Sequence, residues 1–233
     1  MMFSATSVLL AALSFASSVL AAPAPINPLK LSGCPIGNAK PNLATLAMPA
    51  GTINYVALGV GVQNYSCGAT GTFASVGAVA KLFDISCFVN GPLMNGIQDA
   101  AFAAASVSKG LVPSKKMEDI LGKLPITLGD HYFITNPAPN ATGVSPEFDF
   151  RAGAKKGDPT AFAVMKRFAG AASPAGPTNV DFLSLQNIGG AIGGILASSI
   201  LRVDTKGGQP PASCTPNSTV SVPYVAKYWL IKG

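Results

Sequence analysis

Short segments in which apolar and polar or small residues alternate recur along this chain of 233 residues, separated by Gly, Pro and Asn. The clearest runs over residues 52–65, where every second position from Val56 to Val62 is branched and apolar and the positions between are Ala or Gly. A period of two is typical of a β-strand, because successive side chains point to opposite faces. This pattern favours an all-β protein.

Further strand-like segments follow at short, even intervals. Residues 71–86 come after a short Gly-containing connection and are expected to pair with the first strand as a hairpin bent near Gly77. Later candidates cover residues 126–135, 145–153, 161–170, 179–188, 197–205 and 219–233, with a flexible Gly-rich stretch at 189–194. Such spacing predicts one antiparallel β-sandwich or barrel. Residues 96–124 are expected to be a partly helical insertion, since they include an Ala-rich run and a helix cap at Ser114.

The first residues have the pattern of a secretory signal peptide. An uncharged apolar run of roughly a dozen residues, too short for the roughly 20 needed to span a membrane, is followed by small residues and proline. We expect a signal peptide over residues 1–21, an N-terminal extension over 22–51 and a single β-rich domain over 52–233. The mature protein is then secreted and extracellular, without a transmembrane segment.

Cysteines and glycosylation sequons agree with an exported protein. An even number of cysteines favours two disulfides in three alternative pairings, among Cys34, Cys67, Cys87 and Cys214. Sequons for N-glycosylation occur at Asn64, Asn140 and Asn217. Asn64 shares strand parity with apolar Val60 and Val62, so either the strand ends before it or its sequon is unmodified.

Several functions are disfavoured by the residues. The net charge of +6 comes mainly from scattered Lys, with three Arg in all, whereas a nucleic-acid site has clustered Arg and aromatic residues. Gly59 and Gly61 begin a dinucleotide-like motif, but its third glycine position is Asn64 and no helix pattern follows. One His and dispersed acids provide no zinc or iron ligand set. We therefore expect no nucleic-acid partner, no cofactor and no metal.

Successive blocks of the chain resemble a known family. The blocks YVALGVGVQNYSC, GTFASVGAVAKLFDISC, GDHYF, VDFLSLQ, RVDTKGGQPPASC and VPYVAKYWL run in order over nearly the whole mature chain. They are similar to the secreted fungal and bacterial family catalogued as domain of unknown function 3455. The resemblance implies the bridges Cys67–Cys214 and Cys34–Cys87. The polar residues that these blocks carry among structural ones are Gln63, His131 and Arg202, and a functional interpretation groups them around one shared polar pocket. The alternative is structural, with Arg202 paired to an acid beside a rigid turn and His131 a hydrogen-bonded residue of a strand.

Fungal members of this family are often labelled malate dehydrogenase, and the residues here do not support that label. His131 is the only histidine, and the arginines that would bind two carboxylates are dispersed. Glu147 and Asp149 form the best pair of acids, because an i, i+2 spacing in a strand puts both on one face, as glycoside hydrolysis needs. The leading hypothesis is a non-catalytic protein that binds an extracellular ligand, such as a cell-wall glycan or a host surface. The alternative is a small secreted carbohydrate-active hydrolase that uses Glu147 and Asp149.

Aromatic residues near the C-terminus do not form one sugar-stacking platform. Tyr224 and Tyr228 share strand parity, whereas Trp229 points to the opposite face of a regular strand. Core packing is the better explanation for at least one of these faces.

Overall fold

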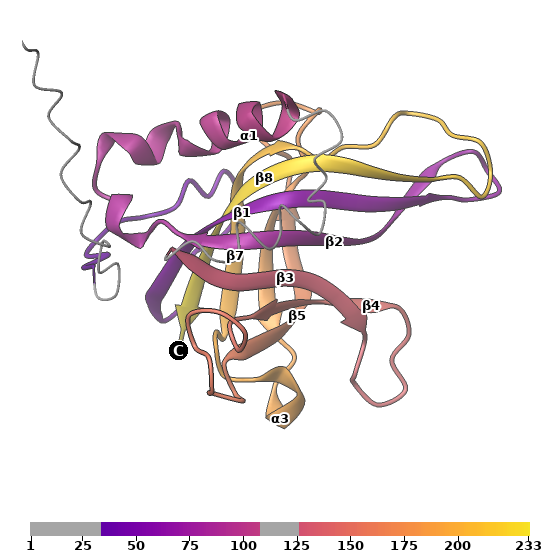
Figure 1. The fold of residues 1–233 in the computed structure, drawn as a ribbon. Helices are drawn as coiled ribbons and strands as arrows, with labels where there is room; N and C mark the ends of the chain where they lie inside the picture. Colours follow the sequence, from indigo (N-terminus) through magenta and orange to yellow (C-terminus); the bar gives the residue numbers. More distant parts are fainter. Residues whose placement is uncertain (1–33, 108–125) are drawn as a thin grey trace, which may run out of the picture.

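Eight antiparallel strands form a closed barrel in which each strand pairs with its neighbours in sequence and the last strand pairs with the first (Figure 1). The computed structural model describes residues 34–107 and 126–233. The strands are β1 (Thr52–Cys67), β2 (Phe73–Asp84), β3 (Thr127–Thr135), β4 (Val144–Asp149), β5 (Phe162–Ala171), β6 (Phe182–Asn187), β7 (Ser199–Gly207) and β8 (Thr219–Lys232). The predicted all-β fold is confirmed, and of the two architectures it is the barrel. The expected signal peptide and the helix capped by Ser114 lie outside the described residues.

The seam between β1 and β8 is the longest strand pairing in the barrel. These strands have 16 and 14 residues, and their register runs from Thr52 opposite Lys232 to Ser66 opposite Thr219. Both strands extend beyond the rest of the barrel together with β2, as an arm seen in Figure 1. The Cys67–Cys214 disulfide lies at this arm, and the Cys67 N–H donates to the Ser218 carbonyl at 2.8 Å. The end of β1 is therefore tied to the β7–β8 connection covalently and by hydrogen bonds.

Alternation along the strands divides the apolar residues into an inner and an outer cluster. The inner cluster fills the barrel and includes Ala57, Ala80, Leu82, Phe148, Phe150, Met165, Ile200, Tyr224 and Tyr228. The outer cluster lies on the opposite face of β1, β7 and β8 and includes Val56, Leu58, Leu201, Val203, Val225, Trp229 and Ile231. Both faces of these strands are buried, and Trp229 faces away from the two tyrosines, as the parity predicted.

The outer cluster is covered by the N-terminal segment from residue 34 and by the connection between β2 and β3. That connection contains the 3-10 helices η1 (Ser86–Phe88) and η2 (Pro92–Asn95) and the helix α1 (Ile97–Val107), which lies across β8 and β1 in Figure 1. Ile36, Leu46 and Met94 are buried in the outer cluster. The Cys34–Cys87 disulfide joins the N-terminal segment to η1. Both disulfides have the pairing that the family resemblance implied.

Two lysines of the barrel contact the covering helices. The Lys227 ammonium points outward from β8, is almost fully buried, and donates to the Met94 carbonyl at 2.6 Å and to Asp204 Oδ2 at 2.9 Å. Asp99 in α1 pairs with Lys206 of β7 at 2.5 Å, in a more exposed setting. Lys227 thus reaches η2 through its hydrogen bond to Met94, and Lys206 reaches the first turn of α1 through an ion pair.

The small residues of β1 leave room for large side chains inside the barrel. A Cβ built on Gly59 would meet the Tyr228 ring at 2.5 Å, and one built on Gly61 would overlap the Val79 carbonyl and the backbone of Ala80. These glycines lie in regular strand pairing with β2 and β8. They are structural glycines in a strand, as the sequence predicted.

Three local features differ from simple strand expectations or refine them. The strand expected over residues 145–153 ends at Asp149, and residues 151–157 form turns. The Gly-rich stretch expected to be flexible contains a short helix, α3 (Gly190–Gly193), in which the Asn187 side chain bonds the Gly193 carbonyl. The β1–β2 register shifts opposite Gly77, whose φ of 132° only glycine adopts readily.

Within the described residues, no helix is long and apolar enough to cross a bilayer.

Candidate functional site

Polar side chains from four strands project into the barrel among its apolar residues. Gln63 follows Ala57, Gly59 and Gly61 on the inward face of β1, and the others are His131 of β3, Arg202 of β7, and Tyr224 and Tyr228 of β8. Strand register brings them together, since Ala80 is opposite both Gly61 and His131, and Arg202 is opposite Tyr228. We call these five residues the inner polar cluster. It includes the three residues of the pocket predicted from the sequence.

His131 is buried in the centre of the cluster and held by aromatic rings. It is 3% exposed, stacks on Phe148 with ring centroids 4.2 Å apart, and lies 5.5 Å from the Tyr228 ring. Its Nδ1 lies 2.9 Å from the Glu147 carbonyl oxygen, which can only accept, so Nδ1 carries the proton. Burial lowers the pKa of His131 to about 4, and the nearby Arg202 charge acts in the same direction. The imidazole is therefore neutral at physiological pH.

The two tyrosines of the cluster share a hydrogen bond inside the barrel. The hydroxyls of Tyr224 and Tyr228 are 3.0 Å apart, and both side chains are fully buried. Burial raises the pKa of each phenol, so both hydroxyls remain protonated donors. The Gln63 side chain lies near the Tyr224 hydroxyl, although its Nε2 makes no hydrogen bond of ordinary geometry there, and Arg202 lies near the Tyr228 hydroxyl. These contacts connect the predicted pocket residues through tyrosines that the prediction did not include.

Arg202 provides the positive charge of the cluster. Its Nε and Nη2 donate to the Asp181 backbone carbonyl at 3.2 and 2.9 Å. No carboxylate of the described residues lies within 4 Å of the guanidinium. Burial raises the pKa of Tyr65, Tyr224 and Tyr228, and the Arg202 charge offsets part of that rise. At His131, where burial lowers the pKa, the same charge acts in the direction of burial. The Arg202 charge therefore influences the pKa of each titratable side chain around it. Its guanidinium donates to a single backbone carbonyl, that of Asp181.

Gln63 has one amide donor without a partner. Its side chain is 5% exposed, and Nε2 makes no hydrogen bond to any described residue. Leaving such a group unpaired costs about 1–3 kcal/mol, so a buried amide is normally satisfied by protein, water or ligand. The Tyr65 hydroxyl, next to the cluster, is by contrast already bonded to the Gly208 carbonyl at 2.6 Å. Gln63 Nε2 is thus the cluster's unused donor.

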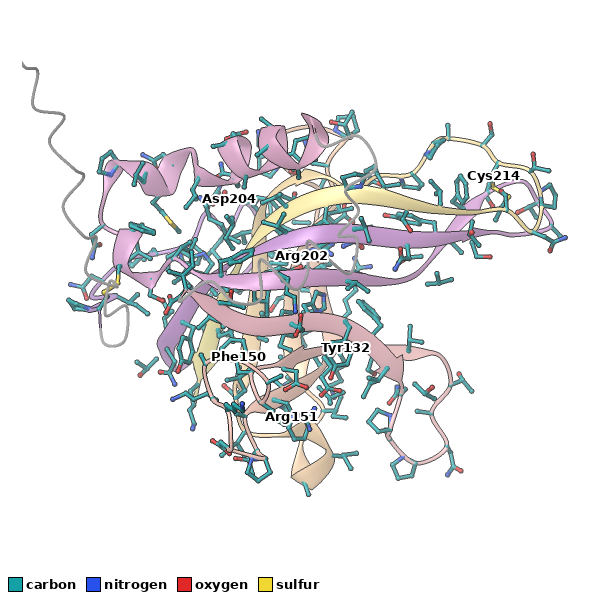
Figure 2. The ribbon with its side chains drawn as sticks, viewed as in Figure 1. Tyr132, Phe150, Arg151, Arg202, Asp204 and Cys214 are labelled. Atoms are coloured by element: carbon teal, nitrogen blue, oxygen red, sulfur yellow. A yellow bond between two sulfur atoms is a disulfide. The ribbon has the colours of Figure 1, made fainter. Side chains whose placement is uncertain are left out.

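Glu147 and Asp149 lie on the outer face of the sheet, away from the inner polar cluster. They share one outward face of β4, as the i, i+2 spacing predicted, while the intervening Phe148 points inward. Arg151 Nη2 contacts Glu147 Oε1 at 2.6 Å and Asp149 Oδ2 at 2.8 Å, and Tyr132 donates to both acids. Figure 2 shows Tyr132 and Arg151 well apart from Arg202. The two acids form an ion-pair cluster around one guanidinium.

The environments of these two acids move their pKa values in opposite directions. Burial raises the pKa of Glu147, whereas hydrogen bonds from Arg151 and Tyr132 hold the pKa of Asp149 below its usual range in spite of its own burial. Such divergence is also what an acid and its partner carboxylate need in hydrolysis. Here, however, Arg151 is bonded to both carboxylates, so the position between them is filled by a cation.

Two surface depressions on the described part of the chain lie away from both groups of residues. One, of about 570 Å³, lies between the N-terminal segment and the start of β1, and another, of about 400 Å³, lies beside exposed Phe168. Neither is lined by the inner polar cluster or by Glu147 and Asp149. No group of three or more potential metal ligands occurs among the described residues.

The three sequons occupy different backbone settings. Asn140 and Asn217 are exposed, have positive φ angles of 58° and 68°, and lie in the β3–β4 and β7–β8 connections. Asn64 lies within β1, paired on both sides, and its Oδ1 accepts a hydrogen bond from the Ser221 hydroxyl at 2.7 Å. β1 therefore continues past Asn64, and the side chain there is half-buried.

The fold and the inner polar cluster together define a class of protein. It is the closed antiparallel β-barrel with polar residues among its inward-facing side chains. A family model described as a protein of unknown function (DUF3455) matches residues 49–232, and the chain belongs to this family. Searches of curated proteins and of solved structures found no match. The family assignment agrees with the resemblance of the sequence blocks.

Sequence reasoning alone missed several residues of the site. Tyr224 and Tyr228 carried the right parity signal, but which partners they meet depends on the register of β8 against β1 and β7. No sequence pattern pointed to Asp181 or Tyr65. Asp181 contributes a backbone carbonyl, and the Tyr65 hydroxyl donates to the carbonyl of Gly208, which is distant in sequence.

Proposed function

We propose that this chain is an exported, non-catalytic binding protein whose ligand site is the inner polar cluster. Two disulfides and the absence of a spanning helix in the described part of the chain are consistent with the extracellular location proposed from the leader. Exposed Asn140 and Asn217 are the sequons that we propose to be glycosylated, whereas Asn64 is held within a paired strand.

The observation that carries the binding proposal is the convergence of polar groups from four strands around an unpaired buried donor. A barrel core needs no polar residues, and each buried polar group costs free energy unless it is paired. Gln63 Nε2 is unpaired among the described residues, and Arg202 has no acidic partner there. A ligand with oxygen acceptors would satisfy both groups.

The test uses His131 as a reporter inside the site. It is the only histidine, so its ring gives a single set of NMR signals. We expect a saturable shift of these signals with at least one probe from a panel of soluble neutral cell-wall oligosaccharides and small organic acids, with the probe recovered chemically unchanged. The shift is expected to be lost in Gln63→Leu. A panel that leaves the His131 signals unmoved, or probes that are turned over by a process dependent on His131, would overturn the proposal.

A second candidate, a carbohydrate-active hydrolase, is supported by the opposite pKa shifts of Glu147 and Asp149. It requires Arg151 to leave the carboxylates when a glycan binds. Release of reducing ends from a polysaccharide panel by the wild type but not by Glu147→Gln would support this function. Binding without product, together with an unaffected Glu147→Gln, favours the binding protein.

A further inference from the structure

The inner polar cluster has the electrostatic character of an anion site. Arg202 is the charged member of the five, and the other four are a neutral histidine, two protonated phenols and an amide. Its guanidinium donates two hydrogen bonds to the carbonyl of Asp181 but lies more than 4 Å from any described carboxylate oxygen. A partly buried guanidinium normally has an anionic partner, because removing its charge from water costs several kcal/mol otherwise.

The donors around that charge match a carboxylate. Gln63 Nε2 is a buried donor with no described partner, and the two tyrosine hydroxyls share one hydrogen bond that leaves one proton for another acceptor. Arginine also presents its donors in a planar fork that suits carboxylate geometry. Apolar side chains of the inner cluster, including Phe133, Leu183 and Val180, lie on the same inward face and suit an organic group.

The size of the charge argues against a dianion. There is one guanidinium, and the Asp181 carboxylate lies near enough to raise the pKa of Tyr65. The net positive charge available to a ligand is therefore at most one, which suits a monoanion better than a phosphate dianion.

We propose that the inner polar cluster binds a small organic monocarboxylate, whose carboxylate accepts hydrogen bonds from Gln63 and Arg202 and whose remaining part contacts the apolar wall. This inference rests on the proposed function, of which it specifies the ligand class. The same carboxylate chemistry occurs in acidic sugars and in apolar organic acids, and the two are separated by the choice of probe.

The experiment titrates two matched pairs of probes at constant ionic strength and pH 7 while the His131 ring signals are followed. The pairs are benzoate with benzamide and glucuronate with glucose. We expect a saturable shift with at least one carboxylate and none with its neutral counterpart. Benzoate alone indicates an apolar acid, and glucuronate alone indicates an acidic sugar.

Three variants test the charge directly. Arg202→Gln is expected to weaken carboxylate binding about tenfold or more, as expected for the loss of a charged hydrogen-bond donor. Asp181→Asn keeps the backbone carbonyl that holds Arg202 and is expected to tighten binding. Arg167→Gln, which removes an exposed arginine on β5, is the matched control and is expected to bind as the wild type does.

Failure of this inference differs from failure of the binding function. Shifts of equal size with a carboxylate and its neutral counterpart, or unchanged carboxylate affinity in folded Arg202→Gln, would overturn the anion proposal while retaining an interior ligand site. Circular dichroism and the dispersion of the methyl NMR signals establish that each variant is folded. If neither pair moves the His131 signals but a neutral oligosaccharide does, the ligand is uncharged and the inference is wrong.

Discussion

At the scale of single residues, the smallest side chains determine where the largest ones fit. Gly59 and Gly61 lie where a Cβ would occupy the space of the Tyr228 ring or of the neighbouring strand. Because Tyr228 contacts His131 and bonds Tyr224, these glycines also position the inner polar cluster. The motif that resembles a nucleotide-binding loop is thus explained by close approach between strands.

We predict that Gly61→Ala is strongly destabilising. The added methyl would overlap the Val79 carbonyl and the Ala80 backbone, neither of which can rotate away as a side chain can. We expect a loss of about 3 kcal/mol in the free energy of unfolding, at the upper end for overpacked sites. Urea denaturation followed by Trp229 fluorescence measures it. Gly96→Ala, whose Cβ would meet nothing within 4 Å, is the control and should change stability by less than about 0.5 kcal/mol.

Residue parity could be predicted from the sequence, but residue partners could not. Alternation placed Tyr224 and Tyr228 on one face and Trp229 on the other, and the structure confirms it. The convergence of Gln63, His131 and Arg202 was expected only through the family resemblance. Their actual neighbours depend on strand register, which local alternation leaves open because a shift by two residues preserves every face.

At the scale of elements, the connection between β2 and β3 acts as a cover for one side of the barrel. The outward faces of β1, β7 and β8 are apolar and would be exposed without η1, η2 and α1. The Lys227 side chain joins this cover to the barrel and is 3% exposed, whereas the side chains of Lys206 and Asp99 are far more exposed to water. The two pairs should therefore differ sharply in their contribution to stability.

We predict that Lys227→Ala loosens the cover and Lys206→Ala does not. Removing Lys227 takes the charged donor from Asp204 Oδ2 and from the Met94 carbonyl, and breaking such a buried pair costs about 3–5 kcal/mol. The exposed pair contributes about 0–1 kcal/mol. Hydrogen exchange should accelerate over residues 86–107 in Lys227→Ala. Equal protection of that segment in both variants would contradict the prediction, and Lys227→Met separates lost volume from lost pairing.

Strands were easier to predict than the way they assemble. All eight appear close to the expected ranges because alternation and turn residues are local signals. A sandwich and a barrel have the same alternation, so the choice between them depended on whether β1 pairs with β8. The early end of β4 was missed because Phe148 and Phe150 continue the alternation, whereas the backbone turns directly after Phe150.

At the scale of the whole molecule, one buried histidine makes stability depend on pH. The folded-state pKa of His131 is about 4, below its ordinary value of 6.5, so the unfolded chain takes up a proton first as pH falls. Stability attributable to neutral His131 is present above about pH 6.5 and is progressively lost towards pH 4, by about 3 kcal/mol in total.

We predict that wild-type stability falls over this window and that His131→Phe flattens the decline. Arg202 lies close to the ring and further disfavours a second positive charge, while Glu147 presents only its carbonyl to the ring nitrogen. Urea denaturation at pH 7, 5.5 and 4.5 provides the measurement. The variant loses the hydrogen bond to the Glu147 carbonyl and starts less stable, so the slope with pH is the decisive quantity. A slope as steep as that of the wild type would assign the decline to carboxylates such as Asp149, whose lowered pKa acts in the same direction at lower pH.

The seam between β1 and β8 also bears on how the chain folds during synthesis. The first and last strands of the barrel share 14 paired positions, so every earlier hairpin can form before the cylinder can close. Until β8 emerges from the ribosome or translocon, the long apolar edge of β1 has one row of unpaired amides and carbonyls, which is a template for association with other chains. The Cys67–Cys214 bond can form once the second cysteine arrives, 147 residues later and just before β8, so it fixes the end of β1 beside the start of its last partner while that edge is still unpaired.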